Sequence, residues 1–226
     1  MFTWTMSGDR GTLPGLRKHE GGALAPLADP PPEGEGTPEL WEPELVRSIY
    51  VALLRAVNVG GRNQVAMSDL RQVLTKLGFE DVQSLLQSGN LVFKTNAGPA
   101  GTLEATLEAE MQTRLGLKTA FFVRTAREMD AVIASNPFPA EAKRDPSRLL
   151  VVLLKDAPKA NAVEGLRAAI KGPELVQTKG RHAYVVYPAG IGRSRLTNTL
   201  IEAKLGTQGT GRNWNTVLKL TGLAKG

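Results

Sequence analysis

The 226-residue chain contains no cysteine and only two histidines, His19 and His182. The absence of thiols excludes disulfide scaffolds, thiolate zinc sites and cysteine nucleophiles. With two histidines a histidine-rich metal centre is excluded as well, so we expect no metal and no cofactor. The chain has no apolar run of the roughly 20 residues that a membrane helix needs, and residues 1–20 lack the apolar core of a signal peptide. These absences predict a cytoplasmic protein with no membrane partner.

Charge is unevenly distributed along the chain. Residues 1–46 hold 7 of the 14 prolines and 7 of the 24 glycines, and their three basic and eight acidic residues give a net charge of −5. Proline lacks a backbone donor and glycine loses much entropy on folding, so we expect this leader to be disordered. Residues 47–226 have 25 basic and 14 acidic residues, a net charge of +11. The sequence therefore predicts a basic folded body preceded by an acidic leader.

The first part of the body, residues 47–125, alternates strand-like and helix-like patterns. The apolar run 48–57 predicts a strand that ends in a turn. Apolar residues spaced i, i+3, i+4, i+7 from Leu70 to Leu77 predict a helix. Two short strands around a hairpin turn, at 82–87 and 91–94, are followed by a helix over 103–115 and a strand at 120–123. The β-α-β-β-α-β order is that of a ferredoxin-like unit, the alpha-beta plait.

The pattern recurs after a connector, residues 126–147, in which we expect a short helix and then a loop at 136–146. The second series, residues 148–226, consists of a strand at 148–155, a helix at 163–170, hairpin strands at 175–179 and 183–187, a helix at 196–205 and a terminal helix from Trp214. The sequence thus predicts an α+β fold of two tandem ferredoxin-like repeats, in which a helix replaces the last strand of the second copy.

The first strand of each repeat indicates how the repeats are arranged. Residues 49–54 and 149–154 are apolar at every position that would point to either face of a sheet. A half-exposed antiparallel strand would instead alternate apolar and polar residues. We therefore expect both faces of each sheet to be covered, by helices and by the other repeat.

Short motifs occur in both halves of the body. They are YVALLRAVNVGG at 50–61, MSDL at 67–70, QSGN at 87–90, NPF at 136–138, GRS at 192–194 and RNWNT at 212–216. Together they resemble the bacterial family called domain of unknown function 1697, over roughly residues 48–224. The resemblance implies two ferredoxin-like units and no established activity, so no catalytic residue is carried over. Ala56 stands where the resemblance predicts glycine, and Gly211 stands where it predicts alanine. Each exchange replaces one small residue by another, so neither weakens the resemblance.

Two loops of the first half could hold a ligand. In the loop after the first strand, consecutive glycines could turn backbone N–H groups toward an anion, reinforced by arginine. Its candidate residues are Arg55, Asn58, Gly60, Gly61, Arg62 and Asn63. The alternative is a strand-exit turn in which asparagine and glycine serve backbone geometry. The first interpretation of segment 88–90 is a hairpin turn. The alternative is that Ser88, Gly89 and Asn90 also face a ligand.

Two segments of the second half carry cations beside helix starts. Arg193, Ser194 and Arg195 precede a helix, where backbone N–H groups would favour an anion. Arg212, Asn213, Trp214 and Asn215 could stack on and hydrogen-bond a flat ligand. However, the helical spacing of Trp214 with Val217 favours a core position for the indole, and Asn213 could simply cap that helix.

Three functions are compatible with these features. The basic body favours binding of an anionic partner, either a nucleotide, a phosphorylated metabolite or a nucleic acid. A small-molecule enzyme with a pocket between the repeats, using Asn58, Ser88 and Asn213, is the second hypothesis, although no catalytic constellation is recognisable. The third is a protein-interaction scaffold, which would require a flat apolar patch.

Overall fold

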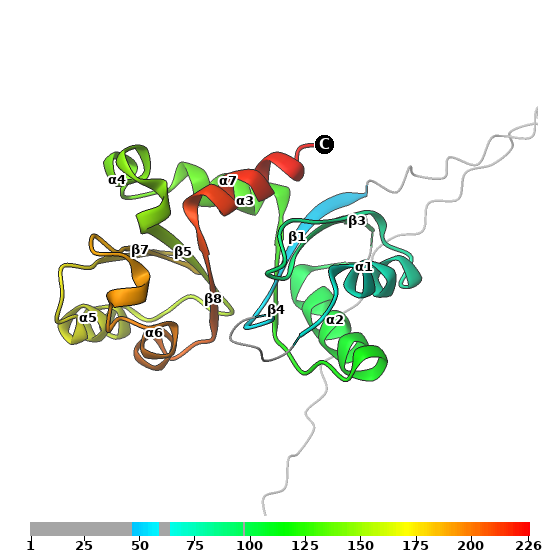
Figure 1. The fold of residues 1–226 in the computed structure, drawn as a ribbon, viewed down its shortest axis with the longest axis horizontal. Helices are drawn as coiled ribbons and strands as arrows, with labels where there is room; N and C mark the ends of the chain where they lie inside the picture. Colours follow the sequence, from blue (N-terminus) through cyan, green and yellow to red (C-terminus); the bar gives the residue numbers. More distant parts are fainter. Residues whose placement is uncertain (1–46, 59–63, 97) are drawn as a thin grey trace, which may run out of the picture. The chain divides into compact units, whose positions relative to one another are not determined.

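The computed structural model describes residues 47–58, 64–96 and 98–226 of the chain (Figure 1). The leader, residues 1–46, lies outside the described residues. So do Gly60, Gly61, Arg62 and Asn63 of the first candidate loop.

The first half, residues 47–125, folds as a four-stranded antiparallel sheet with two helices. Its elements are β1 (Ser48–Leu54), α1 (Met67–Lys76), β2 (Glu80–Ser84), β3 (Asn90–Thr95), α2 (Ala100–Leu115) and β4 (Phe121–Thr125). The strands lie in the order β2-β3-β1-β4. The helices bury the apolar positions that predicted them: α1 buries Leu70, Val73 and Leu74, and α2 ends at Gly116 in the left-handed conformation.

The connector and the second half, residues 148–226, follow. The connector contains α3 (Ala126–Ala134) and α4 (Pro139–Arg144), and the 3-10 turn η1 (Pro146–Arg148) leads into the second sheet. The remaining elements are β5 (Leu149–Leu154), α5 (Ala160–Ala169), β6 (Leu175–Lys179), β7 (His182–Val186), the 3-10 turn η2 (Ile191–Arg193), α6 (Asn198–Leu205), β8 (Gly209–Asn213) and α7 (Trp214–Leu223). The strand order β6-β7-β5-β8 repeats that of the first sheet.

The expected replacement of the last strand by a helix is wrong, because β8 is present and pairs with β5. Two glycines hide this strand from a sequence pattern, since glycine has a low strand propensity. The structure shows why small residues stand there: a Cβ atom on Gly209 would lie 2.7 Å from Cγ1 of Val152, and one on Gly211 would lie 2.9 Å from Cδ2 of Leu150. Close approach to β5 therefore selects glycine.

The loop expected at 136–146 contains the short helix α4. Pro139 stands in its first turn, where the missing N–H of proline is no loss. The N–H of Phe138 donates to Oδ1 of Asn136 at 2.9 Å, which fixes the chain just before the helix.

Three clusters of buried side chains occupy the spaces between these layers. One lies between the first sheet and α1 and α2, and another lies between the second sheet and α5 and α6. The central cluster joins residues of both sheets with α3 and α7 (Figure 1). In β1, Val51 and Leu53 face the central cluster, whereas Ala52 and Leu54 face the helices. Both faces of the first sheet are therefore covered, as its apolar strand predicts.

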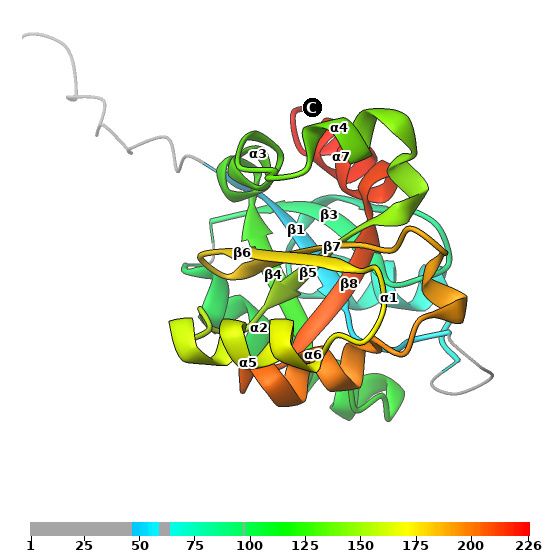
Figure 2. The same cartoon turned by 90° about the vertical axis from the view of Figure 1, so that its left-hand side faces the viewer.

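The second sheet is covered in the same way. Val151 and Leu153 of β5 belong to the central cluster, and Val152 and Leu154 belong to the cluster beneath α5 and α6. Figure 2 looks onto this side of the molecule, with α5 and α6 below the strands of the second sheet. Among the helices of the described residues, none has the length and apolar character needed to span a bilayer.

Candidate functional site

Arg212 of β8 connects the two halves. Its Nη2 donates to the carbonyl oxygens of Leu54 and Ser88, each at 2.9 Å, and its Nε donates to Oδ1 of Asn90. Its Nη1 donates within the second half to the hydroxyl of Thr210 and the carbonyl of Gly211. Burial lowers the pKa of Arg212 to about 10, so the guanidinium is charged at neutral pH. Hydrogen bonds inside the protein therefore already engage this cation.

The hairpin 88–90 lies against Arg212 and is engaged in the fold as well. Asn90 is fully buried and donates to the carbonyl of Leu85 at 2.8 Å and to the hydroxyl of Ser88 at 2.9 Å. Gly89 has a φ of +66°, and a Cβ atom there would lie 2.5 Å from Cγ2 of Val57. The structure thus brings Ser88, Gly89, Asn90 and Arg212 together as a contact between halves.

The described end of the first candidate loop is held by a side chain. Asn58 donates to the carbonyls of Val65 and Gln87 at 3.0 and 2.8 Å, and accepts from the N–H of Val65 at 2.9 Å. Asn58 and Ala56 both have a φ of 53°. Ala56, where the resemblance predicts a glycine, has a left-handed φ, and a Cβ atom is disfavoured in that conformation, so alanine is expected to cost stability there.

Arg55 pairs with Glu202 of α6, across the two halves. Its Nε and Nη2 donate to the two carboxylate oxygens at 2.9 and 2.7 Å. This hydrogen bond raises the pKa of Arg55. Burial opposes ionisation of Glu202, but hydrogen bonds from Arg55 and from the N–H of Gly209 outweigh it and lower the pKa of the carboxyl.

The segment 213–215 begins α7. Asn213 caps the helix, because its Oδ1 accepts from the N–H and the hydroxyl of Thr216, both at 2.9 Å. Trp214 is buried in the central cluster, as its helical spacing favours, whereas Asn215 is exposed. The indole consequently has little surface on which a ligand could stack.

The residues 193–195 border a cavity of about 270 Å³. It lies between the chain that follows α5 and the chain that leads into α6, and Lys171, Arg193 and Arg195 at its edge are all exposed. Ile170, Leu196 and Leu200 give it an apolar wall. We call this the basic cavity.

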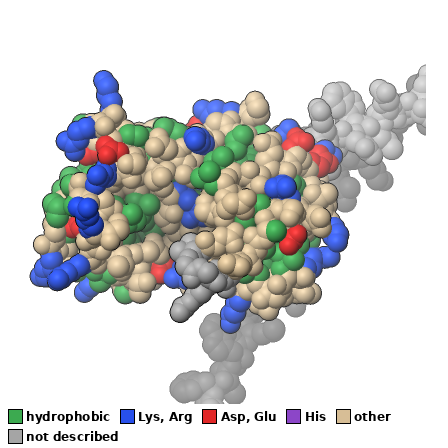
Figure 3. All heavy atoms as spheres, in the orientation of Figure 1, with side chains coloured by type: hydrophobic (Ala, Val, Ile, Leu, Met, Phe, Trp, Pro, Cys, Tyr) green, Lys and Arg blue, Asp and Glu red, His purple; other side chains and the backbone are tan. Residues whose placement is uncertain are grey.

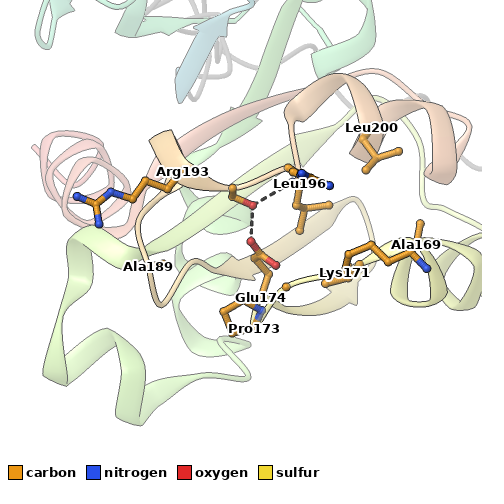
Figure 4. Close-up of a pocket in the computed structure, with 12 residues that line it drawn as sticks. Ala169, Lys171, Pro173, Glu174, Ala189, Arg193, Leu196 and Leu200 are labelled. Carbon is orange, nitrogen blue, oxygen red and sulfur yellow. Dashed lines mark hydrogen bonds between the residues drawn. The ribbon is translucent and has the colours of Figure 1, made fainter.

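Hydrogen bonds of Ser194 shape the floor of the basic cavity. Its hydroxyl donates to the carboxylate of Glu174 and accepts from the N–H of Leu196 at 2.9 Å. Figure 4 shows the carboxylate of Glu174 directed toward this hydroxyl, and the side chains of Arg193 and Lys171 extending in opposite directions. The cations therefore surround the cavity and do not converge on one point.

A second cavity, of about 560 Å³, lies between the halves. Its lining residues are Arg55, Ala56, Glu108, Gln112, Lys118, Thr119, Ala120 and Gln208. It is the larger of the two, but it contains none of Asn58, Ser88 and Asn213, on which an enzyme between the repeats would depend. The cavity lined by Asn58 is a separate one.

The large exposed hydrophobic side chains come from separate segments. In the described part of the chain they are Leu86, Leu175, Ile191 and Leu218. No group of His, Asp and Glu side chains that could hold a metal occurs there either.

The second half has 13 basic and four acidic residues, a net charge of +9. Throughout residues 148–226, all of which the structure describes, no ion pair joins two residues of this half. The cations of this half that are in ion pairs have acidic partners in the connector and the first half. The cations of this half without an ion pair are Lys159, Arg167, Lys171, Lys179, Arg193, Arg195, Lys204, Arg212 and Lys219. On the face seen in Figure 3, lysine and arginine side chains lie over the second half at the left of the view and also over the first half at the right.

Sequence reasoning missed two residues of the basic cavity. No motif of the sequence indicates Lys171 or Glu174 as site residues, although both line this cavity. The usable signal is the Lys171-Gly172-Pro173-Glu174 turn, which ends one helix of the second half as Arg193–Arg195 precede the next. Pairing the two turns requires the fold, because some 20 residues separate them.

Comparison with known proteins identifies a family. The family described as "Protein of unknown function (DUF1697)" matches residues 48–184. No curated protein matches the chain. Among solved structures, "conserved bacterial protein SP0830 from Streptococcus pneumoniae" is similar with a TM-score of 0.63 and 23% identity, over 79% of this chain and 99% of that one. This similarity supports the fold alone.

Proposed function

We propose that this chain, which belongs to the domain of unknown function 1697 family, binds an anionic ligand at the basic cavity. The observation that carries the proposal is the gathering of Lys171, Arg193 and Arg195 around one hollow of the surface, none of them in an ion pair with a residue that the structure describes. The ligand is a nucleotide, a phosphorylated metabolite or a segment of nucleic acid.

The charge of the second half supports this proposal. A net charge of +9 in 79 residues creates a positive potential that attracts anions and raises their local concentration. Four of its 13 cations pair with acids of the connector and the first half, which leaves nine with no ion pair to a described residue. Exposed lysine and arginine are the side chains that neutralise phosphates in non-specific binding.

The lining of the basic cavity supports a ligand that is only partly charged. Leu196 and Leu200 offer apolar contact beside the cations, as in most small-molecule sites. The guanidinium of Arg195 could form paired hydrogen bonds with a phosphate or carboxylate. Glu174 is the one acid in the lining, and its bond with Ser194 ties the carboxylate to the protein.

We also infer that the two halves are ferredoxin-like repeats. The shared strand orders β2-β3-β1-β4 and β6-β7-β5-β8, with a helix after the first and third strand of each sheet, support this inference. In that arrangement the basic cavity lies beside the helices of the second repeat, away from the central cluster.

The test compares two double variants with the same change in net charge. Lys171→Gln with Arg195→Gln alters the basic cavity, whereas Lys76→Gln with Lys118→Gln alters the first half. Binding of inorganic phosphate, ATP and a short labelled RNA is measured by calorimetry and fluorescence anisotropy between ~50 and ~200 mM salt. We expect the first variant to lose about tenfold in affinity per charged contact, and the second to lose little.

Three results would contradict the proposal. They are no binding of any of the three probes at ~50 mM salt, binding that does not weaken as salt increases, or equal losses in the two double variants. Thermal unfolding of both variants is the control for folding. Among the probes, preference for RNA over phosphate and ATP would identify nucleic acid as the ligand class.

A further inference from the structure

Arg124 of β4 is completely buried, which is rare for an arginine. Its Nη2 donates to the carbonyl oxygen of Leu154, at the end of β5, at 2.6 Å. Its Nη1 donates to the carbonyl of Val123 at 2.8 Å and lies 3.7 Å from a carboxylate oxygen of Glu104. The guanidinium of Arg124, in the first half, thus donates a hydrogen bond to the backbone of the second half.

Arg124 and Arg212 occupy equivalent positions in the two sheets. Arg124 is paired with Val51 of β1, and Arg212 is paired with Val151 of β5. Each donates through Nη1 to the carbonyl of the residue that precedes it and through Nη2 to the last residue of the other half's first strand, Leu54 or Leu154. We call the two contacts the Arg124 bridge and the Arg212 bridge. They are reciprocal.

The bridges differ in the third donor, Nε. In the Arg212 bridge, Nε donates to Asn90, which is paired with Leu53 on the neighbouring strand. The residue at the equivalent position of the second sheet is His182, paired with Leu153. In the described residues, Nε of Arg124 and Nε2 of His182 are both buried without a hydrogen-bond partner. Two unpaired buried groups thus stand where the equivalent bridge has a donor and an acceptor.

The other ring nitrogen of His182 determines what Nε2 can do. Nδ1 lies 3.2 Å from the carbonyl oxygen of Lys179, which can only accept. A proton on Nδ1 therefore satisfies that contact and leaves Nε2 of the neutral ring as an acceptor. Nε of an arginine is a permanent donor, so the two orphaned atoms are complementary.

We propose that Nε of Arg124 donates a hydrogen bond to Nε2 of neutral His182, which completes the Arg124 bridge, and that protonation of His182 breaks it. The Arg212 bridge, which uses Asn90, is then insensitive to acid, whereas the Arg124 bridge, which uses His182, opens in acid. A protonated ring would direct N–H toward N–H and bring two positive charges together.

Three charged groups face His182. They are Arg124 on β4, Arg181 on its own hairpin and Glu128 on α3, and Glu128 is itself paired with Arg181 at 2.6 Å. Burial lowers the pKa of His182 first, and Arg124 and Arg181 lower it further, to about 4, against the opposing effect of Glu128. The ring is therefore neutral at pH 7 and able to accept.

The tautomer and pKa of His182 test the proposal directly. In the full chain the only other histidine is His19, so a His19→Gln variant assigns the two ring signals in a nitrogen-detected NMR titration. We expect the proton of His182 on Nδ1, and a pKa well below that of His19. A proton on Nε2 at pH 7.5, or a pKa equal to that of His19, would overturn the proposal.

A replacement by the residue of the other bridge provides the second test. His182→Asn reproduces the Asn90 arrangement, whereas His182→Leu removes the acceptor with a similar volume. Because the pKa of His182 is lowered in the folded state, the histidine reduces stability as pH falls from about 6.5 to about 4. We expect the urea midpoint of His182→Asn to fall less than that of the wild type over this range, and the midpoint of His182→Leu to be the lowest at pH 7.5. Identical pH profiles of wild type and His182→Asn would contradict an acid-sensitive bridge.

Discussion

The two halves have the same strand order but differ in how their charges are used. Among the described residues of the first half, four cations pair with acids of the same half: Arg47 with Glu80, Lys94 with Asp81, Arg114 with Glu110 and Arg124 with Glu104. In the second half no ion pair is internal, and a net charge of +9 results from 13 basic and four acidic residues. The first half, with nine basic and six acidic residues, has a net charge of only +3. The difference teaches that one order of strands is compatible with two very different surpluses of positive charge.

Where the halves meet, the ion pairs of the two halves are nearly symmetric. Lys155 reaches Glu104 and Glu108 of α2 at 2.7 and 2.9 Å, and Arg55 reaches Glu202 of α6. Glu108 and Glu202 each also accept the N–H of a residue that begins the last strand of their half, Phe121 or Gly209. Each half therefore supplies a cation that pairs with acids of the other half.

The largest effect is expected from removing the Arg212 bridge. Arg212→Met would remove the guanidinium donor of the carbonyls of Leu54 and Ser88 and of the amide oxygen of Asn90, and Leu54 would keep only a 3.4 Å hydrogen bond from the hydroxyl of Thr210. Since hydrogen bonds to charged groups contribute about 1.5–3 kcal/mol each, we expect a loss of about 4 kcal/mol in the free energy of unfolding, measured in urea. Arg193→Met, at an exposed cation of the same half, is the control and should change stability by less than about 0.5 kcal/mol. Equal effects would mean that Arg212 does not join the halves.

The two hairpins provide the next comparison. Gly89 and Gly180 both have a positive φ, but only Gly89 lies against other atoms. Alanine at Gly180 meets only backbone strain, about 1 kcal/mol, whereas alanine at Gly89 adds overpacking against Leu54 and Val57, for a total of about 3 kcal/mol. Thermal unfolding of the two variants measures the difference. A smaller effect at Gly89 than at Gly180 would show that its hairpin can move away from β1.

Loss of the Arg55–Glu202 ion pair between the halves is expected to have a moderate and pH-dependent effect on stability. Glu202→Gln removes the charge that Arg55 and the N–H of Gly209 contact, and we expect a loss of about 1–2 kcal/mol at pH 7. The pKa of Glu202 is lowered in the folded state, so its contribution is present above the ordinary value of 4.5 and is lost as pH falls below it. Wild type and variant should therefore converge in stability toward low pH. A constant difference across pH would contradict this role.

The smallest effect concerns Ala56, where the resemblance predicts a glycine. Ala56 has a φ of 53°, so Ala56→Gly relieves strain and is expected to stabilise the protein by about 1 kcal/mol. Ala131 lies exposed within α3, and Ala131→Gly should destabilise the protein by about 1 kcal/mol. Urea unfolding measures both. The opposite signs make the pair a test of conformation, because the chemical change is identical.

Much of the fold could be predicted from periodicity. The continuous apolar character of β1 and β5 predicted that both sheet faces are covered, and the helical spacing of Trp214 favoured its place in the core. The strand β8 could not be predicted, because Gly209 and Gly211 lack strand propensity and are selected by close approach to β5. Local preference is a weak guide where a tertiary contact decides.

The candidate site was predicted less completely than the fold. Arg193 and Arg195 were identified because arginines stand before a helix, but Lys171 and Glu174 complete the cavity from another part of the chain. Arg212 was proposed for a ligand, and the structure instead shows it hydrogen-bonded to Leu54, Ser88 and Asn90. From sequence an arginine with partners inside the fold looks the same as one that faces solvent.

The sequence by itself determined the order of the elements in the first half, the burial of the first strand of each half and the surplus of positive charge in residues 148–226. Only the tertiary structure decided the role of each cation. Arg212 and Arg124 donate to acceptors 158 and 30 residues away in the chain. Hydropathy and propensity act over a few residues, whereas the partner of a buried charge is set by whichever distant segment the core brings within hydrogen-bonding distance.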